Sequence, residues 1–226
     1  MVSRPTLHYV YDPLCGWCYG AAPLVKIARE FMSVRPHGGG MMSGANRQAV
    51  TTDLRDYVMR HDRRIAALTG QAFGEAYFDG LLRDSKAVFD SAPPIAAILA
   101  AESMTGRGLD MIAHLQHAHY VEGRRIAESA VLIDEAQAIG LDAGAFAATL
   151  NENLGEPVQR HIRETRLFMA QLGTTGFPTF VLESGASRQL IDPTPYLEQP
   201  EAWREWLSNA GQSADRSGQA ELNKPR

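Results

Sequence analysis

The chain reads Tyr11-Asp12-Pro13-Leu14-Cys15-Gly16-Trp17-Cys18-Tyr19-Gly20 around its two cysteines, the only ones among 226 residues. Before this segment, residues 6–11 are rich in β-branched and aromatic types, which predicts a β-strand. After it, an apolar stripe at helical spacing predicts a helix that starts at Cys15 and continues to about Val34, with a kink at Pro23. The cysteine pair is therefore expected at the junction between a strand and a helix.

Two cysteines at this spacing suit thiol–disulfide exchange, in which a thiolate attacks a disulfide and a second thiol resolves the mixed disulfide. A Cys15–Cys18 bond closes a very small loop, so it stabilises the fold little as a structural staple. At a helix start, the macrodipole favours the thiolate of Cys15, which we expect to be the nucleophile. Cys18, in the first turn, is expected to be more buried and to act as the resolving thiol. Gly16 and Trp17 add no charge, and Trp17 offers a flat apolar surface to a substrate.

The net charge and the length of the apolar runs argue against nucleic-acid-binding and membrane-spanning proteins. The formal net charge is −4, so the chain lacks the basic excess of a nucleic-acid or anionic-membrane binder. Its apolar runs fall short of the ~18 residues that a membrane-spanning helix needs. The first residues, Met1 to Pro5, contain no apolar signal region before the predicted strand, which favours a cytoplasmic location.

Farther along, residues 50–172 show helical periodicity almost throughout, whereas strand signals return in residues 179–182 and 189–191 with a turn between them. A final short helix is expected around Trp203 and Trp206. This order predicts an α/β core interrupted by an all-helical insertion. The predicted boundaries are a core of residues 1–49 and 173–207, an insertion of residues 50–172, and a disordered tail of residues 208–226.

The two blocks Tyr11–Gly20 and Leu172–Val181 carry a family resemblance. The first closely resembles the active-site segment of DsbA-like thioredoxin-fold proteins, in particular their cytoplasmic disulfide-isomerase and FrnE-like branch. The second contains Gly176-Phe177-Pro178-Thr179 and is similar to the Gly-x-x-Gly-x-Pro-Thr-Phe block of that family. The similarity in layout extends over residues 6–207.

The resemblance implies a thioredoxin fold with a helical insertion. It also implies that Pro178 follows a cis peptide bond beside the cysteines, with Thr179 under the sulfurs and the backbone of Phe177 pairing with an extended substrate. The substrate-facing residues expected on this basis are Gly16, Trp17, Phe177, Pro178 and Thr179. Neither a metal nor an organic cofactor is required. The expected partners are polypeptides with disulfides, or small thiols such as glutathione.

One departure from the family bears on the direction of electron flow. The strongly oxidising periplasmic members carry Pro-His between the cysteines, whereas this chain carries Gly16-Trp17, so no histidine stands beside Cys15. The signal peptide of those members is also missing, and a cytosolic thiol pool keeps cysteines reduced. We therefore expect a reductase or isomerase rather than a net oxidant.

Three alternatives compete with this interpretation. A kappa-type glutathione transferase or isomerase shares the fold, but such enzymes commonly carry serine at the position of Cys15 and do not need Cys18. A polypeptide-binding chaperone would keep its activity without the thiols. A zinc module would need two ligands beyond the cysteines, for which the candidates are His114, His117 and His119.

Two further features concern the surface of the protein. Met41 and Met42 could form an adaptable apolar surface. An open apolar edge could support a homodimer.

Overall fold

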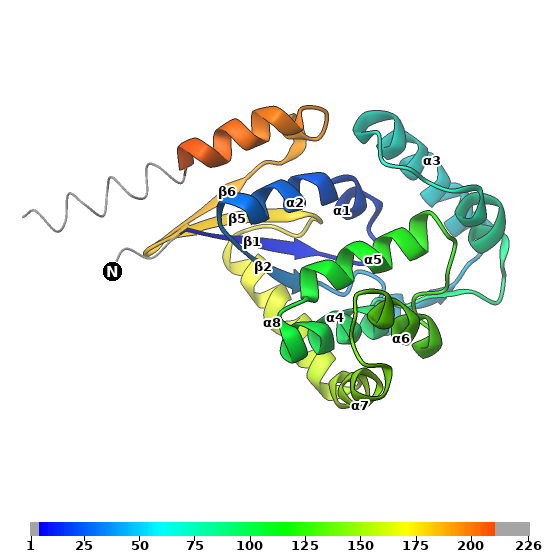
Figure 1. Ribbon diagram of the computed structural model, residues 1–226. Coiled ribbons are helices and arrows are strands. Elements are labelled where there is room, and N and C mark those ends of the chain that lie inside the picture. The colour runs from blue at the N-terminus through cyan, green and yellow to red at the C-terminus, as the bar shows by residue number, and fades with distance from the viewer. Residues whose placement is uncertain (1–4, 211–226) are drawn as a thin grey trace, which may run out of the picture.

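The computed structural model describes residues 5–210, and its centre is a four-stranded sheet with the order β2-β1-β5-β6 (Figure 1). The first two strands run parallel, and the other neighbouring pairs are antiparallel, with Tyr9 opposite Phe180. The last two strands form the predicted hairpin. The bounds of the strands are β1 (Thr6–Tyr11), β2 (Ser33–Gly38), β5 (Thr179–Ser184) and β6 (Ser187–Ile191).

Two helices connect β1 to β2, where the sequence predicts one kinked helix. The first, α1 (Gly16–Gly20), ends at Ala21, and α2 (Ala22–Phe31) follows with Pro23 in its first turn, where a proline is tolerated. The expectation that the helix continues to Val34 is wrong, because residues 33–38 pair with β1 instead. Strand β2 lies at the edge of the sheet, which explains how Pro36 is accommodated there.

The block between the two halves of the sheet is helical, as predicted. Asp142 caps its helix by accepting a hydrogen bond from the backbone of Ala145 at 2.8 Å. A small antiparallel pair, β3 (Gln48–Ala49) with β4 (Val88–Phe89), is an addition that the sequence pattern does not signal. The helices are α3 (Thr52–Thr69), α4 (Ala92–Thr105), α5 (Gly108–Tyr120), α6 (Ser129–Ala138), α7 (Ala143–Asn153) and α8 (Glu156–Gln171).

One face of the sheet is covered by α2 and by the helix of residues 200–210 (Figure 1). On this face the ring of Tyr9 meets that of Phe180 edge-on at 5.4 Å, and Phe180 in turn contacts Trp203 at 5.9 Å. Trp203 is fully buried and donates its indole N–H to the Leu24 carbonyl at 2.9 Å. The C-terminal helix is thereby fixed to the helix that follows the cysteines.

The opposite face is covered by α8, whose Phe168 lies 5.3 Å from the ring of His8. The last helix of the predicted insertion therefore packs on the sheet itself, and α8 also contacts α4 and α7. Residues 208–210, predicted as the start of a disordered tail, are helical, and residues 211–226 lie outside the described part. Between residues 5 and 210 no helix is long and apolar enough to cross a membrane.

Candidate active site

The two cysteines lie where β1 gives way to α1. Cys15 has an extended backbone and occupies the N-cap position, and its carbonyl accepts hydrogen bonds from Cys18 and Tyr19 at 2.9 and 3.1 Å. Both cysteines are free thiols. Cys15 is 6% exposed and Cys18 is fully buried, and burial raises the pKa of the Cys18 thiol well above its usual range. This is the burial order that the spacing predicts.

The second predicted block meets the first at the sulfur of Cys15. The Phe177–Pro178 peptide bond is cis, as the resemblance implies. The Cys15 thiol donates to the Phe177 carbonyl at 3.7 Å, so this backbone lies directly beside the reactive pair. Thr179 is buried at the start of β5, and its hydroxyl donates to the Gly176 carbonyl at 2.8 Å.

The ring of Phe177, next to the cis-proline, packs against Arg166 and against the loop that follows β2. The Arg166 guanidinium lies 5.1 Å from its centroid, and the same side chain donates to the Gly39 carbonyl at 2.6 Å. A Cβ atom at Gly39 would lie 2.1 Å from the Phe177 ring. Only glycine therefore lets the loop after β2 approach the cis-proline segment so closely.

A cavity of about 420 Å³ opens beside the cysteine pair. Its walls include Cys15, Gly16 and Trp17, together with Met41 and Met42, the two methionines predicted as an adaptable surface. Helix α3 forms the opposite wall and places Arg64 over the Trp17 ring at 5.9 Å. The lining is mostly apolar, with one buried carboxyl group, that of Asp62.

Asp62 is 4% exposed and accepts a hydrogen bond from the Tyr77 hydroxyl at 2.7 Å. Burial raises the pKa of this carboxyl to about 7, and the bond from Tyr77 offsets only part of that effect. A Cβ atom at Gly16 would lie 2.2 Å from Asp62 Oδ1. The glycine between the cysteines therefore makes room for a buried acid from α3.

Asp12 is a second buried carboxyl, and it organises the backbone around the site. It accepts hydrogen bonds from the backbone of Leu14 at 2.9 Å, the backbone of Met41 at 2.5 Å and the Ser91 hydroxyl at 2.9 Å. Burial raises the pKa of Asp12 to about 6, against the effect of these three donors. One side chain thus joins the cysteine loop, the methionine loop and the start of α4.

Residues 6–195 match the family model described as the DSBA-like thioredoxin domain. The chain belongs to the DSBA-like thioredoxin domain family. A search of curated proteins gave no match. Among solved structures, this DSBA-like chain is similar to the cytosolic disulfide reductase DsbM from Pseudomonas aeruginosa, with 55% identity and a TM-score of 0.86. That match covers 91% of this chain and 98% of DsbM.

DsbM in complex with glutathione (GSH) is also similar, with 52% identity and a TM-score of 0.84 over the same shares of the two chains. A 2-hydroxychromene-2-carboxylate isomerase is 16% identical, with a TM-score of 0.58, and the match covers 93% of this chain and 98% of the isomerase. At that identity the isomerase shows a shared fold only.

The sequence signal for the two buried acids of this DSBA-like chain is weak. Asp12 lies inside the decisive motif, but nothing in the pattern distinguishes an internal anchor from a turn residue. Asp62 precedes Arg63 and Arg64, so the run resembles a solvated helix face. Among residues 5–210 no group of three or more histidine, cysteine or acidic side chains is arranged to hold a metal ion.

Proposed function

We propose that this protein is a thiol–disulfide oxidoreductase of the reductase type, with Cys15 and Cys18 as its redox centre. The observation that carries the proposal is the placement of a free Cys-x-x-Cys pair at a helix start, against the carbonyl that precedes a cis-proline. It is supported by 55% identity, over 91% of the chain, to a disulfide reductase. No part of this chemistry needs a metal or an organic cofactor.

In the proposed reaction the Cys15 thiolate attacks one sulfur of a substrate disulfide. A mixed disulfide forms and the other substrate sulfur leaves as a thiolate, which takes up a proton. Cys18 then loses its proton and attacks the sulfur of Cys15, which releases the second substrate thiol. The substrate gains two electrons and two protons, and the protein is left with a Cys15–Cys18 disulfide.

Glutathione is the proposed source of electrons, because DsbM has been solved with GSH. One GSH thiolate opens the Cys15–Cys18 disulfide, and a second attacks the resulting mixed disulfide. The products are oxidised glutathione and the dithiol protein, so the two electrons lost by two GSH molecules restore the starting state. A cytosolic location, as in the name of DsbM, fits this dependence on a reducing thiol pool.

Substrate recognition is assigned to the surface around Cys15. The Phe177 backbone beside the thiol can pair with an extended chain, while Pro178 and Thr179 shape that edge. Gly16 and Trp17 line the adjoining cavity with the two methionines, which suits apolar side chains of unfolded or flexible disulfide substrates.

Asp62 supplies a proton-exchanging group within the same cavity. A general base works best when its pKa lies near the operating pH, and burial brings the pKa of Asp62 to about 7. Cys15 lines the same cavity, so we assign to Asp62 the exchange of protons with the Cys15 thiol and with the substrate thiolate that leaves.

Reduction of insulin disulfides by the purified protein with GSH tests the proposal. Turnover should vanish in Cys15→Ser, while Cys18→Ser should accumulate a mixed disulfide with the substrate or glutathione, detectable by mass spectrometry. Insulin-chain binding that survives in Cys15→Ser without any turnover in the native protein would favour the chaperone alternative. Glutathione conjugation that persists in Cys18→Ser would favour the kappa-type enzyme.

The redox equilibrium of the cysteine pair, measured in glutathione buffers, tests in which direction the protein passes electrons. A potential near roughly −270 mV indicates a thioredoxin-like reductant, and one near roughly −120 mV indicates an oxidant. Trp17, directly between the cysteines, reports the transition by its fluorescence. A potential at the oxidising end would contradict the reductase assignment and leave the oxidoreductase class intact.

A further inference from the structure

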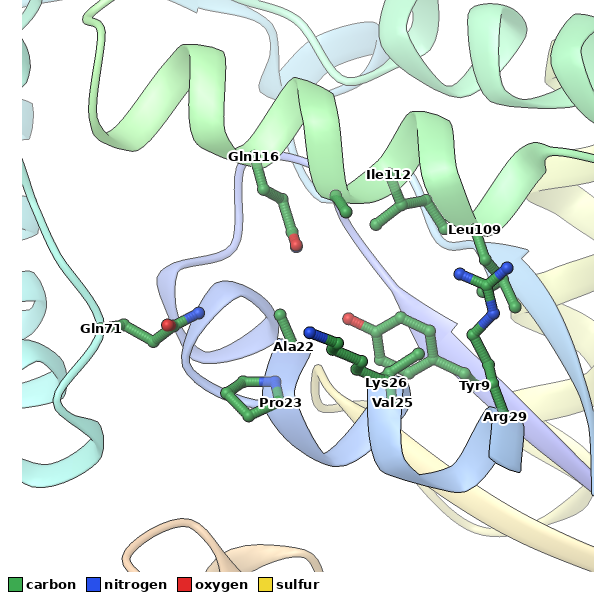
Figure 2. A pocket seen from close by; sticks show the side chains of 11 residues that line it. Tyr9, Ala22, Pro23, Val25, Lys26, Arg29, Gln71, Leu109, Ile112 and Gln116 are labelled. Atoms are coloured by element: carbon green, nitrogen blue, oxygen red, sulfur yellow. The ribbon is translucent and has the colours of Figure 1, made fainter. Parts of the chain in front are cut away.

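A second cavity, of about 540 Å³, lies between α2 and α5 and is larger than the one beside Cys15 (Figure 2). Neither cysteine lines it. Its walls are apolar, with Pro23 and Val25 on one side and Leu109 and Ile112 on the other. The volume falls within the range of small-molecule sites, about 300–1,000 Å³.

The deep end of this cavity holds a buried polar side chain. Gln116 is 1% exposed, and neither its amide nitrogen nor its amide oxygen has a hydrogen-bond partner within the described chain. Figure 2 shows this amide and the Tyr9 hydroxyl both pointing into the space between the two helices. The amide is near enough to lower the pKa of Tyr9 slightly, against a larger rise from burial, but does not meet hydrogen-bond geometry.

A buried amide without a hydrogen-bond partner destabilises the folded protein. A ligand that offers a hydroxyl or carbonyl group at this depth would remove that cost. The Tyr9 hydroxyl donates its proton to the Cys18 carbonyl at 3.2 Å, so its oxygen is still able to accept a hydrogen bond. The deep end of the cavity is therefore suited to a ligand group that both donates and accepts hydrogen bonds.

The rim of the cavity is cationic. Lys26 is exposed on α2 and forms no ion pair with any residue between 5 and 210. Arg29, one turn farther, is held by Asp110 through a bond of 2.7 Å. No aspartate or glutamate lines the cavity in the described chain. Glu30, one turn from Lys26 on the same helix, attracts it electrostatically but is bonded to Arg204 and lies outside the cavity lining, so the Lys26 ammonium is able to pair with an anionic group at the rim.

We propose that this cavity binds a small organic carboxylate that has an apolar body and a second, hydrogen-bonding group. The carboxylate pairs with Lys26, the body packs between Val25 and Ile112, and the second group meets the Gln116 amide. A site of this kind is separate from the surface at which Cys15 meets a disulfide, so both can be occupied together.

The hydrogen bond from Tyr9 to the Cys18 carbonyl connects this site to the redox centre. We expect closure of the Cys15–Cys18 disulfide to shift the Cys18 backbone and with it the Tyr9 hydroxyl, so the ligand should bind the dithiol and disulfide forms with different affinity. Linkage then requires the ligand to shift the redox equilibrium by the same factor. This second step rests on the proposed function, whereas binding itself does not.

Calorimetric titration of the full chain with 4-hydroxyphenylacetate tests the site. We expect saturable binding to one site. Phenylacetate, which lacks the hydroxyl, and 4-hydroxyphenethyl alcohol, which lacks the charge, should each bind at least about tenfold more weakly, the equivalent of one charge-assisted or buried hydrogen bond. Equal affinity for all three compounds, or no saturable binding at millimolar concentration, would overturn the proposal.

Variants locate the binding site. Lys26→Met should weaken 4-hydroxyphenylacetate about tenfold, and Ala113→Trp, at an exposed position on the cavity wall, should abolish its binding by filling the space. Lys86→Met, at an exposed position away from the cavity, is the matched control and should bind normally. Unchanged binding in both Lys26→Met and a folded Ala113→Trp would place the ligand elsewhere and refute the assignment.

The coupling is tested separately by repeating the glutathione equilibrium with saturating 4-hydroxyphenylacetate. A shift in the equilibrium constant equal to the ratio of ligand affinities for the two redox forms supports it. Binding with equal affinity to both forms and no shift would refute the coupling through Tyr9. Binding by a protein that fails to reduce insulin would contradict the proposed function and leave the ligand site standing.

Discussion

At the scale of single residues, the glycine between the cysteines is required by the packing of α3, a helix that is distant in the sequence. Asp62 is held by Tyr77 and reaches the space where a side chain at position 16 would begin. Glycine at this position is therefore a packing requirement as well as a property of the redox motif. It follows that the motif and the insertion cannot be varied independently.

Replacement of Gly16 by alanine tests this relation. The added methyl would lie 2.2 Å from Asp62 Oδ1 and 3.0 Å from Ile65 Cδ1, so we expect a loss of about 1–3 kcal/mol in the free energy of unfolding. Denaturant unfolding under reducing conditions measures it. Because the clash is with one carboxyl, Gly16→Ala combined with Asp62→Ala should be less destabilised than the sum of the two single changes.

A second glycine near the site serves as the control. A Cβ atom at Gly176 meets nothing within 4 Å, and its φ is not positive, so Gly176→Ala should leave stability within about 0.5 kcal/mol of the native value. If Gly16→Ala proved equally neutral, the close approach of α3 to the cysteine pair would be wrong.

At the scale of elements, the Asp12 carboxyl and the Ser91 hydroxyl join three segments. Ser91 donates to Asp12 at 2.9 Å and accepts from the backbone of Met42 at 2.9 Å. In Ser91→Ala both the Asp12 oxygen and the Met42 amide lose a partner, which should cost about 1–3 kcal/mol of stability. Hydrogen exchange at the Met42 amide should accelerate by more than this global loss explains, because this amide loses its hydrogen-bond acceptor.

Ser103→Ala is the matched control for that prediction. Ser103 is exposed on α4, and its hydroxyl donates only to the Ala100 carbonyl of the same helix at 3.0 Å. We expect a change within about 0.5 kcal/mol and normal exchange at Met42. Slowed or unchanged exchange at Met42 in Ser91→Ala would show that the hydroxyl does not hold this amide.

Elements with a regular local pattern could be predicted from the sequence, and the others could not. The hairpin of β5 and β6 and the capping of α7 by Asp142 follow from turn and cap chemistry within a few residues. Strand β2 contains Arg35 and Pro36 and has little strand character of its own. It forms because β1 offers a parallel partner, and such pairing between distant segments leaves no local signal.

The residues of the candidate active site divide in the same way, into those that a local motif predicts and those that depend on distant packing. Cys15 and Cys18 could be predicted because a compact motif carries them, whereas the cis bond before Pro178 is implied only by the family resemblance of its segment. Asp62 could not, since its burial depends on how α3 packs against Gly16. Arg64, expected on a solvated face, lies over the Trp17 ring for the same reason. What the motifs omit is the contribution of the helical block to the surroundings of the cysteines.

At the scale of the whole molecule, the buried acids make stability depend on pH. An aspartate in an unfolded chain has a pKa of about 3.9. In the folded protein burial raises the pKa of Asp62 to about 7 and that of Asp12 to about 6. Between the unfolded and folded values the folded state holds protons that the unfolded chain has released. Taken by themselves, these two carboxyls lower the free energy of unfolding as pH rises from about 4 to 7. Burial lowers the pKa of His37 and His119 to about 3, so these two histidines act in the opposite direction below about pH 6.5.

Asp62→Asn should remove the contribution of Asp62 to this dependence. The amide does not ionise and can still accept the hydrogen bond from Tyr77, so the loss of stability that Asp62 causes between pH 5 and 7.5, on the order of 2 kcal/mol, should disappear. The contributions of Asp12 and of the buried histidines should persist. Asp53→Asn, exposed in the first turn of the same helix, should keep the native slope. Denaturant unfolding of the reduced proteins at several pH values gives the comparison. Identical slopes in the native protein and Asp62→Asn would mean that Asp62 does not change its protonation in this range, and its assignment as the proton-exchanging group of the cavity would fall with it.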